Sequence, residues 1–441
     1  MDPASTLPAQ EPGPPRRSTA VAAALAAAGA LIVGGHILVA DLNSSGLDLL
    51  VNAPPVAGRF EPMAPGAEIL LVLAVIAFVV GLGPSAARRL GWRVLLAWVA
   101  VAGWAWAVSL ALLDPEMGLT GPILRDSEYL HDVPLVGSPG DFLNGFVDRI
   151  DIYETHIRGH PPGMILGLWG LGQIGLGGAI PAALAMITGG ALALPAALVA
   201  LREVAGERRA RVAAPFLVLM PAAIWIATSA DALFAGVSAW GVTLVVLATG
   251  RSGRRGDALA LAGGLLLGVT LMLSYGLILL ATVPLAVAFA RRRTRPLALA
   301  AAAGLLVLAT FATAGFWWPE GLLATRETYY DGVASDRPYG AFLVNNLAAF
   351  AIVLGPAVIA GLALLRDRRV WLLVGGGLAA VALADLSGMS KGEVERIWLP
   401  FVPWVALATC ALPATGVAAR SWLVAAASFA LAFELGVLTS W

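Results

Sequence analysis

The sequence is poor in charged residues and almost free of cysteine. Only 13% of its 441 residues are charged, whereas a soluble domain carries roughly 25%. So few polar side chains cannot cover a water-facing globule, which excludes a soluble protein. Cys410 is the only cysteine and lies in an apolar run, which excludes disulfides within the chain and thiolate metal clusters.

Several signals of common function classes are also missing. The formal net charge is zero, so no bulk field favours nucleic acid. There is no internal repeat and no glycine motif that cradles phosphate, which an ATP-driven or nucleotide-sugar enzyme normally needs. Any chemistry is therefore expected to use a substrate delivered from the membrane or from outside. Lys391 is the only lysine, and with the many arginines, alanines and glycines this indicates a GC-rich, actinobacterial genome.

What the sequence does contain is a series of apolar runs. Hydrophobic residues make up 59% of the chain, and mean hydropathy is +0.83. Runs of about 20 residues recur from Thr19 onward, each long enough to cross a hydrocarbon core of roughly 30 Å. Arginines gather between the runs, and such clusters mark cytoplasmic loops. They are Arg16/Arg17, Arg88/Arg89/Arg93, Arg202/Arg208/Arg209/Arg211, Arg251/Arg254/Arg255, Arg291/Arg292/Arg293/Arg295, Arg366/Arg368/Arg369 and Arg420, which place 20 of the 28 basic residues inside.

This pattern predicts an all-α polytopic membrane protein with about 13 transmembrane helices, its N-terminus cytoplasmic and its C-terminus outside. The predicted spans are 19–40, 68–85, 92–113, 180–201, 211–229, 232–250, 257–273, 275–290, 296–316, 342–365, 370–386, 397–414 and 421–438. Residues 1–18 are expected to form a disordered cytoplasmic tail before an uncleaved anchor. The glycine-rich segment 164–178 is left out, because counting it would turn every later arginine cluster outward. It is expected to be a helix in the outer interface, with a re-entrant segment as the alternative.

With this orientation no cytoplasmic loop is long enough to fold as a domain. A minor outward loop, residues 41–68, joins the first two helices, and three other outward loops stand out. They cover residues 114–162, 317–341 and 385–396. The first contains three of the four histidines. Any chemistry is therefore expected on the non-cytoplasmic face of a bacterial plasma membrane.

The long loop opens with Arg125-Asp126-Ser127-Glu128-Tyr129 and closes with His156-Ile157-Arg158-Gly159-His160-Pro161-Pro162. A carboxylate just above a membrane suits the role of general base toward a hydroxyl. Histidine and arginine at the same level suit the phosphate of a lipid whose tail lies in the bilayer.

These residues resemble the GT-C superfamily of membrane glycosyltransferases. An acidic pair followed by Tyr129 and then His160-Pro161-Pro162 is similar to the branch with protein O-mannosyltransferases and aminoarabinose transferases. Asp231, at the start of a later span, and the run Arg396-Ile397-Trp398-Leu399-Pro400 continue the likeness. Residues 392–398 also resemble actinobacterial transferases that decorate envelope arabinan and mannan, among them a methylthioxylose transferase, which implies a pentose donor.

The resemblance implies a polyprenyl-phosphate-sugar donor, an envelope glycan as acceptor and inversion at the transferred sugar, in cell wall biogenesis. Asp126 would be the base, with Glu128 as the alternative, because the usual adjacent acids are separated here by Ser127. Glu128 or Asp231 would orient the acceptor or hold a divalent cation, and no nucleotide is involved. The remaining substrate-binding residues implied are Tyr129, His156, Arg158, His160, Tyr329, Tyr330, Lys391, Glu393 and Arg396.

The likeness covers roughly residues 92 to 405 and divides the chain. Residues 19–85 would be two additional helices, residues 86–316 a catalytic membrane module, and residues 317–441 a C-terminal region.

Each feature also has a plainer interpretation. The acids are typical of solvated loops, and His160 with Pro161 suits the first turn of a helix. The spacing of His156 and His160 suits a metal only on a continuous helix, which the prolines disfavour. Tyr329 and Tyr330 suit either a sugar-stacking site or an interfacial aromatic belt. A transporter or flippase is the competing function, and it would place ionisable residues inside the spans.

Overall fold

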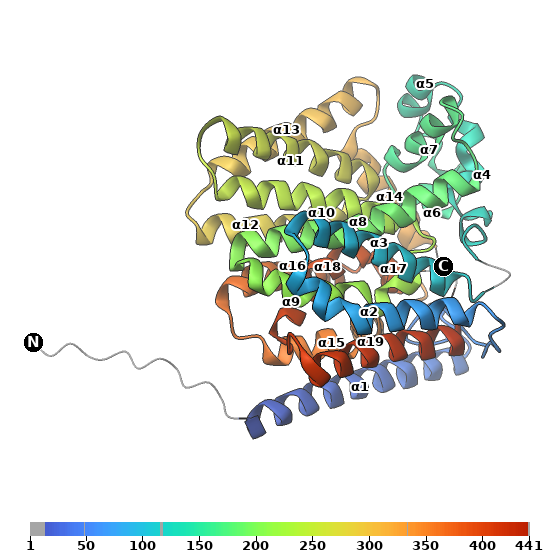
Figure 1. Cartoon of the computed structure of the whole chain (residues 1–441). Coiled ribbons are helices and arrows are strands. Elements are labelled where there is room, and N and C mark those ends of the chain that lie inside the picture. The colour runs from blue at the N-terminus through green and yellow to red at the C-terminus, as the bar shows by residue number, and fades with distance from the viewer. Residues whose placement is uncertain (1–13, 48, 115–117, 333, 440–441) are drawn as a thin grey trace, which may run out of the picture.

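A computed structural model describes residues 14–47, 49–114, 118–332 and 334–439. Its long helices lie roughly side by side in one bundle (Figure 1). The α-helices are α1 (Pro14–Ser44), α2 (Ile69–Arg89), α3 (Trp92–Ala111), α4 (Tyr129–Asp132), α5 (Pro139–Asn144), α6 (Thr155–Arg158), α7 (Gly163–Gln173), α8 (Ala179–Ala205), α9 (Glu207–Val218), α10 (Ala230–Thr249), α11 (Gly253–Leu273), α12 (Thr282–Ala290), α13 (Arg295–Thr313), α14 (Trp318–Asp331), α15 (Tyr339–Leu364), α16 (Arg368–Ser387), α17 (Val394–Ile397), α18 (Val402–Ala406) and α19 (Gly416–Gly436).

Short 3-10 helices and two strands complete the described part. The 3-10 helices are η1 (Pro122–Leu124), η2 (Val133–Val136), η3 (Ile150–Ile152), η4 (Pro221–Trp225), η5 (Tyr275–Ala281), η6 (Leu399–Phe401) and η7 (Leu407–Ala411). Strand β1 (Gly58–Phe60) pairs antiparallel with β2 (Val437–Thr439), with Arg59 opposite Leu438. This pairing ties the loop before α2 to the chain end after α19.

Eleven helical segments of the described chain are long and apolar enough to cross a membrane. They coincide with eleven of the thirteen predicted spans, which confirms an all-α polytopic membrane protein. The predicted span 211–229 is made of two separate pieces, α9 and η4, whereas 275–290 is one continuous helix of η5 and α12 that is too short to count among the eleven. Pro221, at the start of η4, has no backbone N–H to continue a helix, which explains the break after α9.

The N-terminal region differs from the predicted tail. Residues 1–13 lie outside the described residues, and α1 already begins at Pro14. Helix α1 packs along α15, while α2 packs against α3, α9 and α19, as Figure 1 shows. The two helices of residues 19–85 are thus part of the bundle.

The glycine-rich segment forms α7, which has 11 residues. At 1.5 Å per residue it extends about 17 Å, too short to cross a membrane. Its Met164, Ile165 and Leu168 are buried, and it packs against η2, α4 and α11. Ile174, just after the helix, is 71% exposed.

Close helix packing positions the start of α10, which carries Asp231. A Cβ atom on Gly236 would lie 2.3 Å from the carbonyl oxygen of Gly189 on α8. Only glycine allows the two backbones to approach so closely, as is common between membrane helices.

The arginine clusters predicted to be cytoplasmic meet at one end of the bundle, here called the arginine end. Glu203, near the end of α8, pairs with both Arg251 and Arg291, at 3.1 and 3.2 Å. Arg209 pairs with Asp367 at 2.5 Å. The same end therefore collects the loops after α8, α10, α12 and α15.

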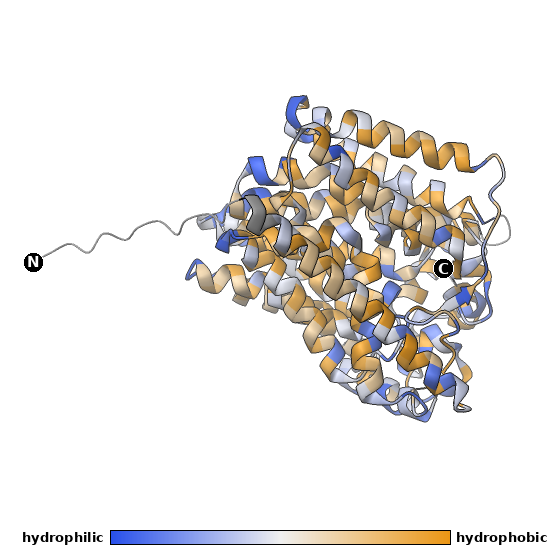
Figure 2. Ribbon diagram, turned by 90° about the horizontal axis from the view of Figure 1, so that it is seen from below, coloured by the Kyte–Doolittle hydropathy of each residue, from blue (hydrophilic) through white to orange (hydrophobic). Residues whose placement is uncertain are grey.

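The opposite end, here called the loop end, carries α4, α5, α6 and the end of α19, whereas α1 begins at the arginine end (Figure 1). Hydrophilic residues gather toward the two ends, and the helices between them are mostly hydrophobic (Figure 2). This distribution is the one expected for a bundle whose middle lies in lipid.

Candidate active site

The centre of the candidate site is Arg396, on the one-turn helix α17. The chain enters this helix through Gly392 and Glu393, both with positive φ, 90° and 57° respectively. A positive φ is uncommon for a residue such as glutamate and marks a backbone held by its surroundings. The turn directs the Arg396 side chain inward, where it is only 6% exposed.

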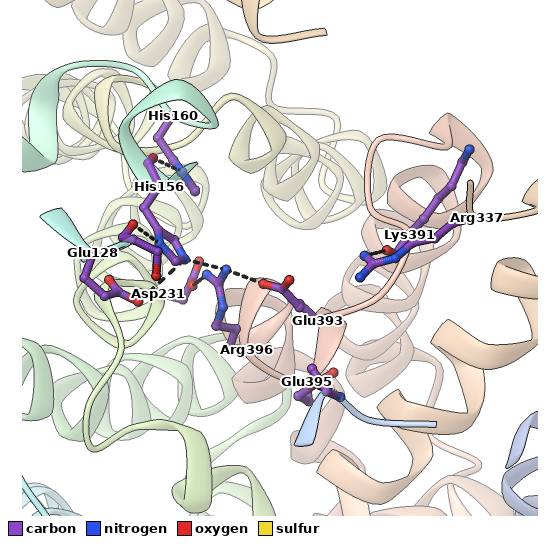
Figure 3. Close-up of polar contacts among 11 residues, drawn as sticks. Glu128, His156, His160, Asp231, Arg337, Lys391, Glu393, Glu395 and Arg396 are labelled. Atoms are coloured by element: carbon purple, nitrogen blue, oxygen red, sulfur yellow. Dashed lines mark hydrogen bonds and ion pairs between the residues drawn. The ribbon is translucent and has the colours of Figure 1, made fainter. Parts of the chain in front are cut away.

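Arg396 donates hydrogen bonds to three side chains (Figure 3). Its Nη1 lies 2.8 Å from Asp231 Oδ2, and its Nη2 lies 2.7 Å from Glu393 Oε2. The same Nη2 lies 2.7 Å from His156 Nε2. Asp231 is in the first turn of α10 and His156 on α6, so three distant segments converge on one guanidinium.

These contacts fix the protonation of His156. Its Nδ1 lies 2.6 Å from the carbonyl oxygen of Ser127, which only accepts, so Nδ1 carries the proton. Nε2 then accepts from Arg396. Burial and, next, the charge of Arg396 lower the pKa of His156 to about 4. The imidazole ring is therefore neutral at physiological pH and adds no positive charge to the cluster.

Glu128 completes the centre. It precedes α4, is 3% exposed, and its Oε1 lies 3.6 Å from His156 Nε2. It interacts electrostatically with Arg396. The next residue, Tyr129, is 2% exposed, and its hydroxyl makes no hydrogen bond with the described residues. Burial and the charge of Asp231 raise the pKa of Tyr129 well above its usual value, so this phenol remains a hydrogen-bond donor.

His160 lies beside Tyr129 at the edge of the centre, with ring centroids 5.9 Å apart. Its Nδ1 lies 2.8 Å from the carbonyl oxygen of His156 and therefore donates to it. Burial lowers the pKa of His160 to about 4. The neutral ring keeps a lone pair on Nε2, which can accept a proton or a hydrogen bond.

The carboxylates exceed the cations in this centre. Glu128, Asp231 and Glu393 surround the single guanidinium of Arg396. Burial raises the pKa of Glu393, but the charges of Arg396 and Arg337 outweigh burial and hold that pKa below its ordinary value. Glu393 therefore stays ionised at neutral pH.

An excess of carboxylates suggests a site for a divalent metal ion, because carboxylate oxygens bind such ions. However, no three histidine, cysteine or acidic side chains of the described residues are arranged to hold one metal ion. Both nitrogens of His156 are already engaged in hydrogen bonds.

The structure does not bring Asp126 into the centre. Asp126 is exposed, and the neighbour it influences is His131, whose pKa is raised chiefly by a hydrogen bond to Asp132. Arg158 is half-buried. Its carbonyl accepts from Thr325, and its guanidinium makes no ion pair with the described residues.

Lys391, Tyr329 and Tyr330 form a separate group with Arg337, and Figure 3 shows Lys391 and Arg337 apart from Arg396. Lys391 Nζ donates to the carbonyl of Ala334 at 2.8 Å and lies 5.2 Å from the ring centroid of Tyr330. The Tyr329 hydroxyl accepts from the backbone N–H of Lys391 at 2.6 Å. These contacts fix the loop before α17, and they leave the Lys391 ammonium committed to a carbonyl.

Sequence reasoning missed the part of the site supplied by the loop before α2. A cavity of about 550 Å³ lies between that loop, the end of α3, Arg125, Glu393 and the chain end at Thr439. Glu395, which is fully buried, accepts the backbone N–H of Ala57 at 2.7 Å and so holds the loop beside α17. The two acids in Glu393-Val394-Glu395-Arg396 were visible in the sequence. Their spacing did not reveal that Glu393 contacts Arg396 whereas Glu395 binds the loop before α2.

Neither a comparison with protein-family models nor one with curated proteins finds a match. Two solved structures are similar to the chain. The first is ArnT from Cupriavidus metallidurans bound to undecaprenyl phosphate, with 17% identity and a TM-score of 0.48. The second is the same protein in the apo state, with 18% identity and a TM-score of 0.45. Each likeness covers 73% of this chain and 59% of the ArnT chain, so this chain spans less than two thirds of that length.

Proposed function

We propose that this protein is an inverting glycosyltransferase that moves a sugar from a polyprenyl-phosphate donor to a hydroxyl of an envelope glycan. One observation carries the proposal. The four short motifs that resemble the GT-C transferases lie far apart in sequence, and Glu128, His160, Asp231 and Arg396 from these motifs meet in one buried centre. A resemblance arising by chance gives no reason for its residues to converge.

In this proposal Glu128 is the general base, in preference to Asp126. A base must reach the acceptor hydroxyl inside a site that excludes water, and Glu128 is buried in the centre whereas Asp126 is exposed. The acceptor oxygen forms a bond to the anomeric carbon as its proton passes to Glu128. The bond from that carbon to the phosphate oxygen breaks, and polyprenyl phosphate leaves with the electron pair.

Arg396 acts as a positioning residue rather than as the phosphate ligand. Its guanidinium is already occupied by Asp231, Glu393 and His156, so it holds the carboxylates in fixed directions. Arg158 is the better candidate for the leaving phosphate, because it is half-buried and makes no ion pair with the described residues. A guanidinium binds a phosphate in a bidentate manner and stabilises the charge that develops on it.

The proposal places the reaction on the periplasmic face of a bacterial plasma membrane. The arginine end carries the clusters expected in the cytoplasm, and the centre is at the other end of the bundle. A lipid-linked donor fits a chain that has no nucleotide motif. The acceptor is the envelope polymer available on that face, and an actinobacterial pentose donor remains the most specific version of the proposal.

The test is transfer by purified protein in lipid vesicles, using radiolabelled polyprenyl-phosphate pentoses and hexoses and envelope glycan fragments. We expect a labelled glycan with inverted anomeric configuration. Glu128→Gln should lower kcat by about 10²- to 10⁴-fold, the usual contribution of a general base. Asp126→Asn is the matched control and should remain within about threefold of wild type.

Two results would count against the proposal. Equal activity of wild type and Glu128→Gln would remove Glu128 as the base. Lipid movement across the vesicle membrane without any labelled glycan would instead favour a flippase. In cells, deletion of the gene should remove one sugar substituent from an envelope polymer, and only the variants active in vitro should restore it.

A further inference from the structure

The cavity beside the candidate centre is built mainly by one segment, residues 49–68, here called the strap. The strap connects α1 to α2, and it supplies ten of the residues that line the cavity. Glu393 belongs to both places, because it lines the cavity and also pairs with Arg396. The cavity therefore borders the proposed centre at Glu393.

The strap is held in one conformation by polar side chains from several elements. Five of its backbone groups bond to side chains of α1, α15, α17 and the link before α15. These bonds are Arg337 Nε to Leu49 O (3.0 Å), Asn43 Nδ2 to Val51 O (3.0 Å), His36 Nδ1 to Pro54 O (2.8 Å), Asn345 Nδ2 to Pro55 O (2.9 Å) and Ala57 N to Glu395 Oε1 (2.7 Å). Because the strap is already fixed in the free protein, it loses little conformational entropy when a ligand binds in the cavity.

The charges of the lining distinguish among ligands. Four carboxylates face two guanidiniums around this cavity: Glu61, Glu68, Asp114 and Glu393 against Arg59 and Arg125. Arg59 is already paired with Glu61 at 2.5 Å. The excess of negative charge repels a phosphate or a carboxylate, which separates this cavity from the place where the donor phosphate binds.

The remaining lining is a mixture of polar and apolar groups. Asn52 offers an amide, while Leu50, Met63 and Leu113 offer apolar surface. Carboxylates accept hydrogen bonds from hydroxyls, amides both accept from and donate to them, and apolar side chains cover the C–H faces of a sugar ring. At about 550 Å³ the cavity is within the usual range for small-molecule sites.

A small hollow of about 20 Å³ adjoins the cavity and shares Met63, Asp114, Leu438 and Thr439 with it. Glu434 lines this hollow. Its side chain is more than nine-tenths buried, and its Oε2 makes no hydrogen bond with the described residues. A buried carboxylate oxygen without a partner is costly, and a ligand hydroxyl or a water carried with the ligand would satisfy it.

We infer that this cavity is the acceptor subsite, and that it selects a neutral, multiply hydroxylated group such as the terminal sugars of an uncharged glycan. This inference rests on the proposed function and adds the class of acceptor to it. The acceptor lies in the cavity with its reacting hydroxyl toward Glu393 and the centre, and the strap determines which acceptors fit.

The test compares two substitutions on the strap. Ala64 and Ala67 are both exposed, but only Ala64 lines the cavity. Ala64→Trp should fill part of the cavity and raise the apparent KM for a neutral oligosaccharide acceptor by about tenfold or more, with a smaller change in the KM for the lipid donor. Ala67→Trp is the matched control and should behave as wild type.

A second measurement addresses charge. Neutral alkyl glycosides of one to three sugar units are compared with the same glycosides carrying a terminal carboxylate or phosphate. We expect the neutral forms to have the higher kcat/KM, by about tenfold or more. The double variant Glu61→Arg with Glu68→Arg makes the lining net positive and should reverse the preference.

The outcomes separate the two proposals. If wild type transfers sugar but Ala64→Trp and Ala67→Trp have equal acceptor KM values, the acceptor subsite lies elsewhere and the proposed function stands. If wild type prefers the anionic acceptors, the inference about acceptor charge is wrong. If wild type transfers no sugar from any lipid donor, the proposed function fails, and the acceptor subsite fails with it.

Discussion

The two ends of the bundle hold ionic clusters with opposite composition. At the arginine end one carboxylate, Glu203, lies between two guanidiniums, Arg251 and Arg291. At the loop end one guanidinium, Arg396, contacts two carboxylates and a neutral histidine directly, with Glu128 close by. The first cluster is partly exposed, with side-chain exposures between 20% and 30%. In the second, Arg396 and Asp231 are 6% and 4% exposed, and Glu393 at its edge is 31% exposed.

Burial gives the two clusters different energetics. A partly exposed pair near water is screened and contributes little to stability. A buried group of charges depends on each partner, because removal of one leaves the others without compensation in a medium of low polarity. The pairs at the arginine end therefore tie neighbouring loops together, whereas the stability of the loop-end cluster depends on Arg396.

The largest expected effect follows from breaking the buried cluster. Arg396→Met should lower the free energy of unfolding by about 3–5 kcal/mol, because the carboxylates of Asp231 and Glu393 lose their partner. Thermal unfolding in detergent measures this change. A triple variant that adds Asp231→Asn and Glu393→Gln should recover part of the stability without activity. No recovery would show that Arg396 stabilises the fold by packing instead.

Acid should weaken the loop end in a defined pH range. The pKa values of His156 and His160 are lowered to about 4 by burial, so the unfolded chain binds more protons than the folded chain between about pH 4 and 6.5. Stability therefore falls as pH decreases through that range. Each histidine should cost on the order of 1–2 kcal/mol between pH 7 and pH 5.

The measurement is the unfolding temperature of wild type and His160→Gln as a function of pH. The variant should depend less steeply on pH between 7 and 5. Identical slopes would mean that His160 titrates normally in the folded protein. Glu393 acts in the same direction at lower pH, because its lowered pKa contributes stability that is lost as the carboxylate is protonated.

A smaller effect is expected for Arg158, which makes no ion pair with the described residues. Arg158→Gln should raise the KM for the lipid donor about tenfold, equivalent to roughly 1.4 kcal/mol of binding, because one guanidinium contact to phosphate is lost. Its acceptor KM should not change. Lys391→Gln is the comparison, since the Lys391 ammonium already binds a carbonyl and its loss should leave the donor KM unaffected. The reverse pattern would assign the phosphate to Lys391.

The smallest effect is expected at the arginine end. Glu203→Gln should lower the free energy of unfolding by less than about 1 kcal/mol, as is usual for partly exposed pairs, and should leave transfer activity at the wild-type level. The same unfolding and transfer assays test both statements. A loss as large as that of Arg396→Met would show that the two clusters do not differ in the way their exposure indicates.

Much of the fold was predictable because lipid imposes a simple rule. A segment that crosses the membrane must satisfy its own backbone and present apolar side chains, so its length and hydropathy are visible in the sequence. The exceptions are informative. The segments 211–229 and 275–290 are apolar enough to be predicted as spans. However, the first is divided into α9 and η4, and the second is a single shorter helix that begins as the 3-10 helix η5. Hydropathy reports neither a break nor a change of helix type.

The sequence predicted which residues belong to the candidate site but not which side chains each of them contacts. Glu128, His160, Asp231 and Arg396 were identified from short motifs, and they do lie together. Asp126 was preferred as the base, and Lys391 and Arg396 were expected to bind the substrate. The structure gives these residues other surroundings, because neighbouring side chains point in different directions and the sequence does not state which of them faces inward.

The sequence alone determined that the chain is a helical membrane protein, where its helices run and which loops collect arginine, because these properties depend on local composition and on the cost of moving charge into lipid. The tertiary structure alone decided that Arg396 contacts Asp231, Glu393 and His156, that Glu128 is buried while Asp126 is exposed, and that residues 49–68 form the wall of a cavity next to α17. Such facts depend on contacts between residues up to several hundred positions apart. Only packing in three dimensions sets those contacts.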